Sequence, residues 1–170
     1  VEIDSIATDI YNFSEFNLIN VTLNDTLFIR SELRGGPKND DIYNLNLYHT
    51  INENNNSVVG IQRSDIKFKE QTWHINENNN ASNKVVFNNG FKDFVVDSLV
   101  LSHAEEQISL NAIVRDTTYK NVNVDFKDVD LRKITPDIDS LDLSGIVNGE
   151  LNLLQKDGAY YPNSTVKISS

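Results

Sequence analysis

Roughly the last hundred residues repeat short segments in which apolar and polar side chains alternate, separated by turns rich in Asn and Asp. Residues 107–114 read QISLNAIV, and residues 121–126 read NVNVDF. Strict alternation predicts β-strands with one apolar face, because successive side chains of a strand point to opposite faces of the sheet. Strands of this kind build a sheet with one long apolar face, and whatever covers that face decides what the chain can do.

The apolar sides of these segments form rows of mostly aliphatic side chains. The candidate residues of the apolar face are Leu99, Leu101, Ile108, Leu110, Ala112, Val114, Val122, Val124, Phe126, Leu151 and Leu153. Two all-β arrangements account for such rows. One is a β-sandwich in which two sheets cover each other, and the other is a single curled, mostly antiparallel sheet with an open, taco-like hydrophobic groove. The alternation alone leaves both open.

Strands of five to nine residues at a spacing of roughly 8–12 residues are typical of an all-β chain. The expected strands are 1–13 (two strands or one long bent one), 16–23, 26–33, 41–51, 57–68, 71–76, 84–88, 91–102, 107–115, 119–127, 141–147, 149–155 and 164–169. Asn148-Gly149 predicts a two-residue hairpin turn. The apolar phase slips after Phe126, which predicts a β-bulge near Lys127-Asp128. A helix is expected only around Leu131 to Leu141, where Pro136 limits its length.

Composition narrows the classes of partner. The hydrophobic fraction is 39% and the net charge is −10, with a pI near 4.6 and a mean hydropathy of −0.39. This acidity argues against nucleic acid and against electrostatic docking on an anionic membrane surface. Cysteine is absent, which excludes disulfides and thiolate sites. The chain starts at Val1 without a signal peptide or a long apolar run, so we expect a segment whose targeting or anchoring part lies elsewhere.

The sequence predicts no catalytic constellation, no cofactor motif and no metal site. His49, His74 and His103 lie in separate predicted strands without a zinc-binding spacing. No G-x-S-x-G elbow or Gly-rich phosphate loop occurs. A series of six aspartates could suggest a calcium site, but their spacing is not that of a calcium-binding loop. Its members are Asp125, Asp128, Asp130, Asp137, Asp139 and Asp142. A lone strand tryptophan such as Trp73 is more often a core residue than a sugar-stacking platform.

The order of motifs from about residue 58 onward resembles a known family. A W-x-I strand at Trp73 is followed by an Asn-rich turn, and an I-x-L-x-A strand begins at Ile108. The module L-S-G-x-x-N-G-x-L-x-L, followed later by Pro, begins at Leu143. This order is similar to the TamB-type translocation and assembly proteins of the AsmA-like superfamily, in the version carried by Bacteroidota-like lineages. The similarity covers roughly two thirds of the chain, and the charged loop from Gly35 to Asp41 has no counterpart that we can assign.

The resemblance implies a non-enzymatic segment of a long periplasmic protein that is anchored in the inner membrane. Proteins of this family are implicated in phospholipid transfer between the two membranes and in outer-membrane assembly. Their partners are phospholipid acyl chains and an outer-membrane barrel of the Omp85 class. On this interpretation residues 1–170 form one stretch of a longer repetitive groove without an internal boundary. The alternative is a surface-exposed adhesin or carbohydrate-binding β-sandwich, with Trp73, Tyr160 and Tyr161 as ring platforms.

Overall fold

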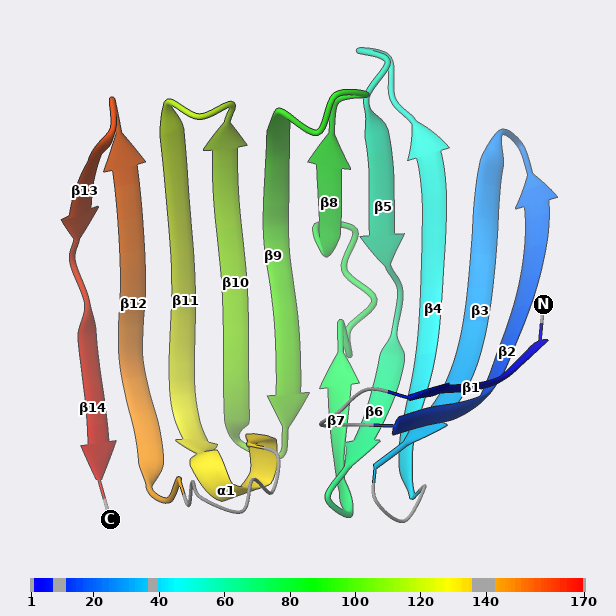
Figure 1. The fold of residues 1–170 in the computed structure, drawn as a ribbon, viewed down its shortest axis with the longest axis horizontal. Helices are drawn as coiled ribbons and strands as arrows, with labels where there is room; N and C mark the ends of the chain where they lie inside the picture. The colour runs from blue at the N-terminus through cyan, green and yellow to red at the C-terminus, as the bar shows by residue number, and fades with distance from the viewer. Residues whose placement is uncertain (1, 8–11, 37–39, 136–142, 170) are drawn as a thin grey trace.

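The computed structural model describes residues 2–7, 12–36, 40–135 and 143–169. These residues form one 14-stranded sheet in which every strand pairing is antiparallel (Figure 1). The strands are β1 (Glu2–Ala7), β2 (Asn12–Leu23), β3 (Thr26–Gly35), β4 (Asp41–Ile51), β5 (Ser57–Ile61), β6 (Ser64–Phe68), β7 (Gln71–Ile75), β8 (Lys84–Phe87), β9 (Asp93–His103), β10 (Glu106–Arg115), β11 (Tyr119–Asp130), β12 (Ile146–Lys156), β13 (Ala159–Pro162) and β14 (Thr165–Ser169). The all-β prediction is confirmed, and the described residues contain no second sheet of the kind that a sandwich requires.

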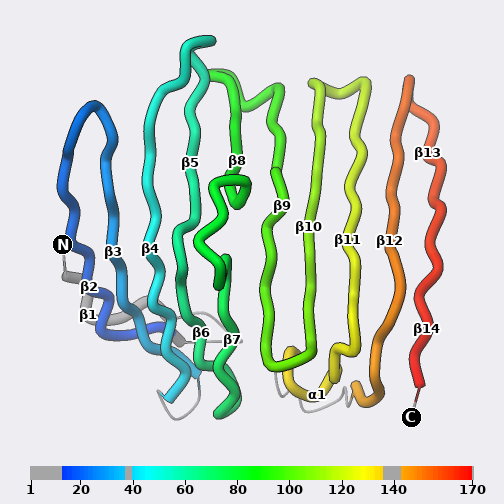
Figure 2. Tube along the Cα trace, turned by 180° about the vertical axis from the view of Figure 1, so that it is seen from behind, coloured from blue at the N-terminus to red at the C-terminus, as the bar shows by residue number. Residues whose placement is uncertain are grey.

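Strand neighbours in the sequence are mostly neighbours in the sheet. Short strands share the positions beside long ones: β5 and β6 both pair with β4, β8 and β7 both pair with β9, and β13 and β14 both pair with β12. The predicted strand 57–68 is therefore two strands, separated at Gln62-Arg63. At the other edge, β1 pairs with the first half of β2. Figures 1 and 2 view the sheet from opposite sides, and β1 lies in front of it in the first and behind it in the second.

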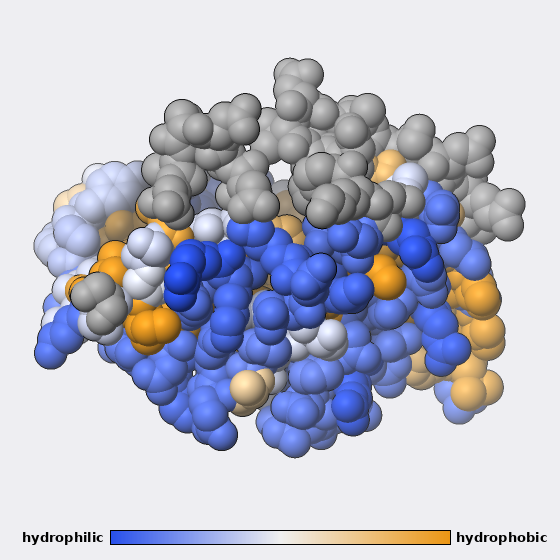
Figure 3. Space-filling view, turned by 90° about the horizontal axis from the view of Figure 1, so that it is seen from below, coloured by the Kyte–Doolittle hydropathy of each residue, from blue (hydrophilic) through white to orange (hydrophobic). Residues whose placement is uncertain are grey.

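Paired residues of an antiparallel sheet point to the same side, so the strand register assigns every side chain to one of two faces. The apolar face is the face that carries Leu110, and the polar face is the one that carries Asn111. Over β10 to β12 the polar face holds hydrogen-bonded amides, with the Asn152 side-chain amide donating to Asn121 Oδ1 at 3.2 Å and also to Asn123 Oδ1. Figure 3 shows that hydrophilic residues predominate on the lower side of the molecule in that view, with hydrophobic groups toward its left and right ends.

The core of the described residues is small and lies at one end of the apolar face, called here the lower end. Trp73, Val129 and Val147 are 2%, 0% and 4% exposed, and partly buried residues pack around them. Those partly buried residues are Ile66, Leu101, Ile108, Phe126, Leu131 and Ile134. Two of them belong to α1 (Leu131–Ile134), the short helix that follows β11 in Figure 1. The expectation of a brief helical stretch is confirmed, whereas Pro136 lies outside the described residues.

The accessible surface shows how little of the chain this core buries. It amounts to 11,040 Å², whereas a compact monomer of 19.3 kDa has about 8,500 Å² by the usual scaling of surface with mass. The excess is expected for a sheet one layer thick, because each strand is then covered on one side at most.

Two turn predictions had opposite outcomes. The bulge near Lys127-Asp128 is confirmed, because the β11–β12 register shifts between Phe126 and Val129 and Asp128 has a φ of 51°. The hairpin at Asn148-Gly149 is wrong, because β12 runs through both residues. Gly149 is needed there for space: a Cβ would lie 1.8 Å from the Thr165 carbonyl oxygen of β14. The expected strand 141–147 falls partly outside the described residues, and within its described part, from residue 143, the strand begins only at Ile146.

Candidate functional site

All the candidate residues predicted for the apolar face lie on that one face of four adjacent strands. Leu110 pairs with Leu99 on one side and Val124 on the other, and Val124 in turn pairs with Leu151. The same register joins Leu101, Ile108 and Phe126, and it joins Ala112, Val122 and Leu153. Val114 completes the set from the upper end of β10. The sequence alternation therefore correctly predicted which side chains share a face.

The burial of these residues changes along the strands. Leu101, Ile108 and Phe126 pack against the core at the lower end. Farther up, Leu99, Leu110, Val122 and Val124 are half-buried. Leu151 and Leu153 are 44% and 39% exposed, whereas the smaller side chains of Ala112 and Val114 are buried. The face thus runs from a packed end to a partly open middle.

The apolar face extends beyond the residues that the sequence singled out. One row, called here the aliphatic row, crosses six neighbouring strands from β5 to β12. Its members are Val59, Val85, Val96, Ala112, Val122 and Leu153, and each is paired directly with the next. At about 4.8 Å per strand, these five steps span about 24 Å.

The missed members of the row, Val59, Val85 and Val96, were only partly recognisable in the sequence. Residues 57–61 read SVVGI, a short apolar run without clean alternation, and such a run does not show which of its side chains share a face. In β9 a register irregularity at Ser98, whose φ is 48°, changes the phase between Leu99 and Val96. A bulge of this sort moves the apolar residues from odd to even positions, so simple alternation loses them.

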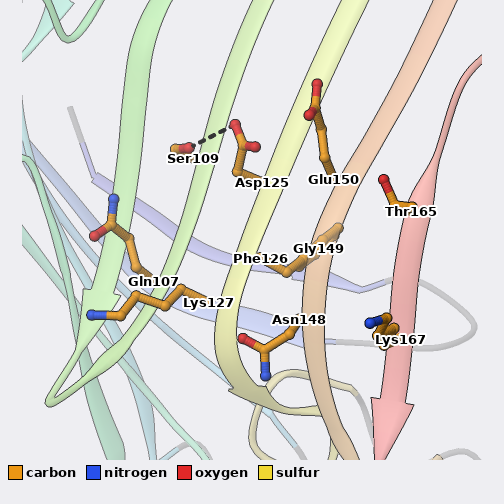
Figure 4. Close-up of a pocket in the computed structure, with 10 residues that line it drawn as sticks. All are labelled: Gln107, Ser109, Asp125, Phe126, Lys127, Asn148, Gly149, Glu150, Thr165 and Lys167. Atoms are coloured by element: carbon orange, nitrogen blue, oxygen red, sulfur yellow. Dashed lines mark hydrogen bonds between the residues drawn. The ribbon is translucent and has the colours of Figure 1, made fainter.

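The polar face carries a shallow pocket of about 560 Å³ at its lower end (Figure 4). Its lining includes Gln107, Ser109, Asp125, Phe126, Lys127, Asn148, Gly149, Glu150, Thr165 and Lys167. The Ser109 hydroxyl donates to Asp125 Oδ2 at 3.4 Å, and the Asn123 amide donates to Glu150 Oε1 at 2.7 Å. Lys127 points away from Asp125 in Figure 4. Each of these two carboxylates thus accepts a hydrogen bond from a side chain of a neighbouring strand.

The histidines are dispersed over the sheet. His49 lies on the apolar face of β4, and His103 Nδ1 donates to the Thr72 carbonyl at 2.7 Å. On the polar face, His74 Nδ1 lies 2.6 Å from Asp65 Oδ1. Among the described residues, no three His, Cys, Asp or Glu side chains are grouped as metal ligands would be.

Trp73 belongs to the core, as its isolation in a strand suggested. Its side chain is 2% exposed and its ring stacks at a tilt on His103, with a centroid distance of 5.4 Å. This burial is incompatible with a role as a sugar-stacking platform. In the acidic series, Asp125 lies on the polar face, Asp128 forms the bulge and Asp130 caps α1. Asp137, Asp139 and Asp142 lie outside the described residues.

Comparisons with protein-family models, with curated proteins and with solved structures find no match. Within the described ranges, no helix is long and apolar enough to cross a membrane.

Proposed function

We propose that this chain is a non-enzymatic segment of a lipid-carrying groove, in which the apolar face of β9 to β12 holds phospholipid acyl chains. The observation that carries the proposal is the aliphatic row. It is continuous over six strands, its side chains contain no polar atoms, and Leu153 at its end is 39% exposed. A hydrocarbon chain laid along the row would meet apolar side chains at every strand.

Length and energy both favour an acyl chain as the occupant. The row spans about 24 Å, which exceeds the thickness of one bilayer leaflet, about 15 Å or half of the hydrocarbon core. Each CH₂ transferred from water to an apolar surface gains about 0.8 kcal/mol. A uniform aliphatic surface offers this gain at every position, so a lipid could slide along it without stopping at one deep minimum.

The opposite face of the same strands explains why another sheet would not cover this segment from behind. Asn111, Asn123 and Asn152 lie on the polar face, where their side chains bond to one another or to the backbone. Burying such amides beneath an apolar layer costs free energy unless every hydrogen bond is kept. The two faces of β10 to β12 therefore suit different surroundings: water behind the sheet and hydrocarbon in front of it.

At the level of the whole protein, the proposal extends to location and partners. The chain would be periplasmic, as part of an envelope protein anchored in the inner membrane. It would carry phospholipid between the inner and outer membranes and contribute to outer-membrane assembly. Contact with an Omp85-class barrel would come from regions outside this segment.

Photo-crosslinking tests which face meets lipid. The 170-residue chain is mixed with phosphatidylethanolamine–phosphatidylglycerol vesicles that contain a phospholipid with a diazirine in its acyl chain, irradiated and mapped by peptide mass spectrometry. We expect adducts at Leu110, Val124 and Leu151 and none at Asn111 or Asn123. Adducts spread equally over both faces, or none at all, would contradict the proposal.

A matched pair of variants on β10 adds a functional readout. Leu110→Asp places a charge on the apolar face, and Ile113→Asp places the same charge on the polar face of the same strand, where Ile113 is 38% exposed. Leu110→Asp should reduce transfer of a fluorescent phospholipid between vesicles at least tenfold, whereas Ile113→Asp should leave transfer unchanged. Circular dichroism of both variants checks that the sheet persists. Equal loss of transfer in two folded variants would argue against the groove.

The carbohydrate-binding alternative has weaker support. Trp73 is buried, and Tyr160 and Tyr161, although 61% and 55% exposed, are successive residues of β13 and point to opposite faces of the sheet. They cannot form one stacking platform. A glycan would have to use the polar pocket of β10 to β14, and saturable glycan binding that is lost on Glu150→Gln would favour this alternative.

A further inference from the structure

Two polar side chains interrupt the apolar face near its upper end, far from α1 (Figure 1). Lys120 of β11 is paired directly with Gln155 of β12, and each lies two residues above a member of the aliphatic row, Val122 in β11 and Leu153 in β12. Continued alternation would place an aliphatic residue at both positions. Both strands have a paired neighbour on each side, so the interruption belongs to the interior of the sheet.

Gln155 is buried without a partner for its side-chain carbonyl. The residue is 8% exposed, and in the described part of the chain its Oε1 atom accepts no hydrogen bond. Its neighbours on the same face are Lys120 and Tyr160. A buried amide oxygen that lacks a hydrogen bond costs free energy. A leucine, the residue that β12 has two positions below, would avoid this cost, so the structure keeps Gln155 at the expense of stability.

The half-buried side chain of Lys120 also lacks an ion pair or hydrogen bond among the described residues. The register places two other ionised side chains on the apolar face of β3 to β14, those of Asp41 and Glu106. Asp41 Oδ1 accepts a hydrogen bond from the Lys69 backbone N–H at 3.0 Å, and Glu106 pairs with Lys133. Lys120 is therefore the ionised side chain of this face that has no partner, and it adjoins the unpaired amide.

From this combination we propose that Lys120 and Gln155 bind the headgroup of a phospholipid whose acyl chain lies along the aliphatic row. The proposal rests on the proposed function and adds a site for the polar part of the ligand. The Lys120 ammonium donates to a phosphate oxygen, as charged donors do in strong hydrogen bonds. Gln155 Oε1 accepts from an N–H or O–H of the headgroup. Ethanolamine and glycerol headgroups carry such a donor, whereas the quaternary ammonium of choline does not.

The position of the pair relative to the row suits one phospholipid. Two residues along a strand span about 7 Å, so the phosphate would lie about that far above the row, and the glycerol and ester groups would bridge the distance. Lys120 and Gln155 belong to the last two strands of the row, so the acyl chain would run from β12 toward β5. A cation at this point also offsets the repulsion between a phosphate and a chain whose net charge is −10.

Fluorescence titration with lipids that share one labelled acyl chain and differ in headgroup tests the proposal. The 170-residue chain should bind phosphatidylethanolamine and phosphatidylglycerol most tightly, phosphatidylcholine less tightly and diacylglycerol about tenfold more weakly than the first two. Equal binding of all four would overturn the headgroup site and leave the groove intact, whereas binding of none would overturn both. Tighter binding of a free fatty acid with the same label would assign Lys120 to a carboxylate and would also overturn the proposal.

Three variants separate the roles of the two side chains. Lys120→Gln should weaken binding of phosphatidylethanolamine and phosphatidylglycerol about tenfold and leave diacylglycerol binding unchanged. Lys156→Gln is the matched control, because Lys156 is exposed and pairs with Tyr119 on the opposite face, and it should leave all lipids unchanged. Gln155→Leu should reduce phosphatidylethanolamine binding to the level of phosphatidylcholine and raise the urea midpoint of unfolding, because the buried unpaired oxygen is gone.

Circular dichroism establishes that each variant keeps the sheet. Equal effects of the two lysine variants on phospholipid binding, or loss of diacylglycerol binding in folded Lys120→Gln, would overturn the headgroup site. So would a Gln155→Leu variant that weakens phosphatidylethanolamine and phosphatidylcholine alike, because the amide would then not recognise the headgroup donor.

Discussion

The lower end and the middle of the apolar face are built from the same strands but differ in their surroundings. On β11, Val129 is fully buried, with 0% exposure, whereas Val124 is half-buried. Both are valines, and the register places both on the apolar face. The difference comes from what lies over them: Val129 packs among Trp73, Val147 and the residues of α1. An apolar strand face is thus only a potential core, and covering elements determine which part becomes one.

This contrast indicates that two regions of one sheet have different roles, one in stability and one in ligand binding. The covered end supplies most of the packing energy that fixes the strands, since apolar burial is the main favourable contribution to folding. The partly open middle then contributes less to stability and remains available to a ligand. If this is correct, substitutions at the lower end and in the middle of the apolar face should differ in their effect on stability far more than their chemistry would suggest.

Trp73→Ala should have the largest effect. Removing a buried tryptophan costs about 3–5 kcal/mol, a large share of the 5–15 kcal/mol typical of a folded domain. Urea unfolding followed by circular dichroism measures the loss, because Trp73 is the only tryptophan and its fluorescence disappears with it. Phe91→Ala is the control: Phe91 is 71% exposed and stacks on Phe87, so it should cost less than about 1 kcal/mol. Similar costs would mean that the core is not concentrated at the lower end.

Gly149→Ala should have the next largest effect, at the boundary between the two regions. Gly149 lies between Val147 and Leu151 on the apolar face of β12, and its φ is +123°. An added Cβ would meet the Thr165 backbone, so we expect a loss of about 2–3 kcal/mol and faster hydrogen exchange in β14. Gly90→Ala is the control, because its nearest neighbour is a Lys92 side-chain atom at 3.7 Å. Unchanged exchange in β14 would contradict this account of the boundary.

Val129→Ala and Val124→Ala compare the regions with the same substitution on one strand. The buried valine should cost about 2 kcal/mol, from lost transfer energy and the cavity left behind. The half-buried valine should cost less than about 1 kcal/mol, since its site already meets solvent. Urea titrations of both variants give the difference. Equal costs would show that the middle of the face is as well covered as its end, which would leave no room for an acyl chain.

Alternation was enough to predict the all-β class and the shared face, because the period of two is a direct property of extended backbone. It also located the bulge at Asp128, where the apolar phase slips. It misassigned Asn148-Gly149, since this pair has the composition of a hairpin turn while Gly149 serves a close approach between strands. Local sequence cannot distinguish these two uses of glycine, because the second depends on a strand that follows later in the chain.

The extent of the candidate site was harder to predict than its centre. Leu110 and Val124 lie in long, regular strands, whereas Val59 and Val85 come from the short strands β5 and β8. Their place in the aliphatic row depends on which strands become neighbours, and β8 joins β5 only because β6 and β7 form a hairpin below them. The burial of each residue could not be predicted from the sequence either, because alternation gives no information on which end of the apolar face α1 covers.

The smallest expected effect concerns the electrostatic contacts that hold α1 over the lower end. Asp130 Oδ1 accepts a hydrogen bond from the Arg132 backbone N–H at 3.0 Å, and Asp130 Oδ2 pairs with the Arg132 guanidinium at 3.1 Å. The Glu106 carboxylate accepts from the Asp130 backbone N–H and pairs with Lys133. The side-chain hydrogen bond from Arg132 is the main reason that the pKa of Asp130 lies below the value of 3.8 of an unperturbed aspartate.

A lowered pKa in the folded state means that Asp130 stabilises the fold fully above about pH 3.8 and loses this contribution as the pH falls through its folded pKa. Asp130→Asn keeps a residue that can cap the helix but removes the charge, so it should cost about 1 kcal/mol or less at pH 6, because Arg132 is largely exposed. The cost should shrink toward zero at pH 2. Urea unfolding at pH 6, 4 and 2 measures it, with Asp157→Asn in the exposed β12–β13 turn as the control. If the loss of unfolding free energy stayed constant across this pH range, the charge of Asp130 would not be what holds α1 over the lower end of the apolar face.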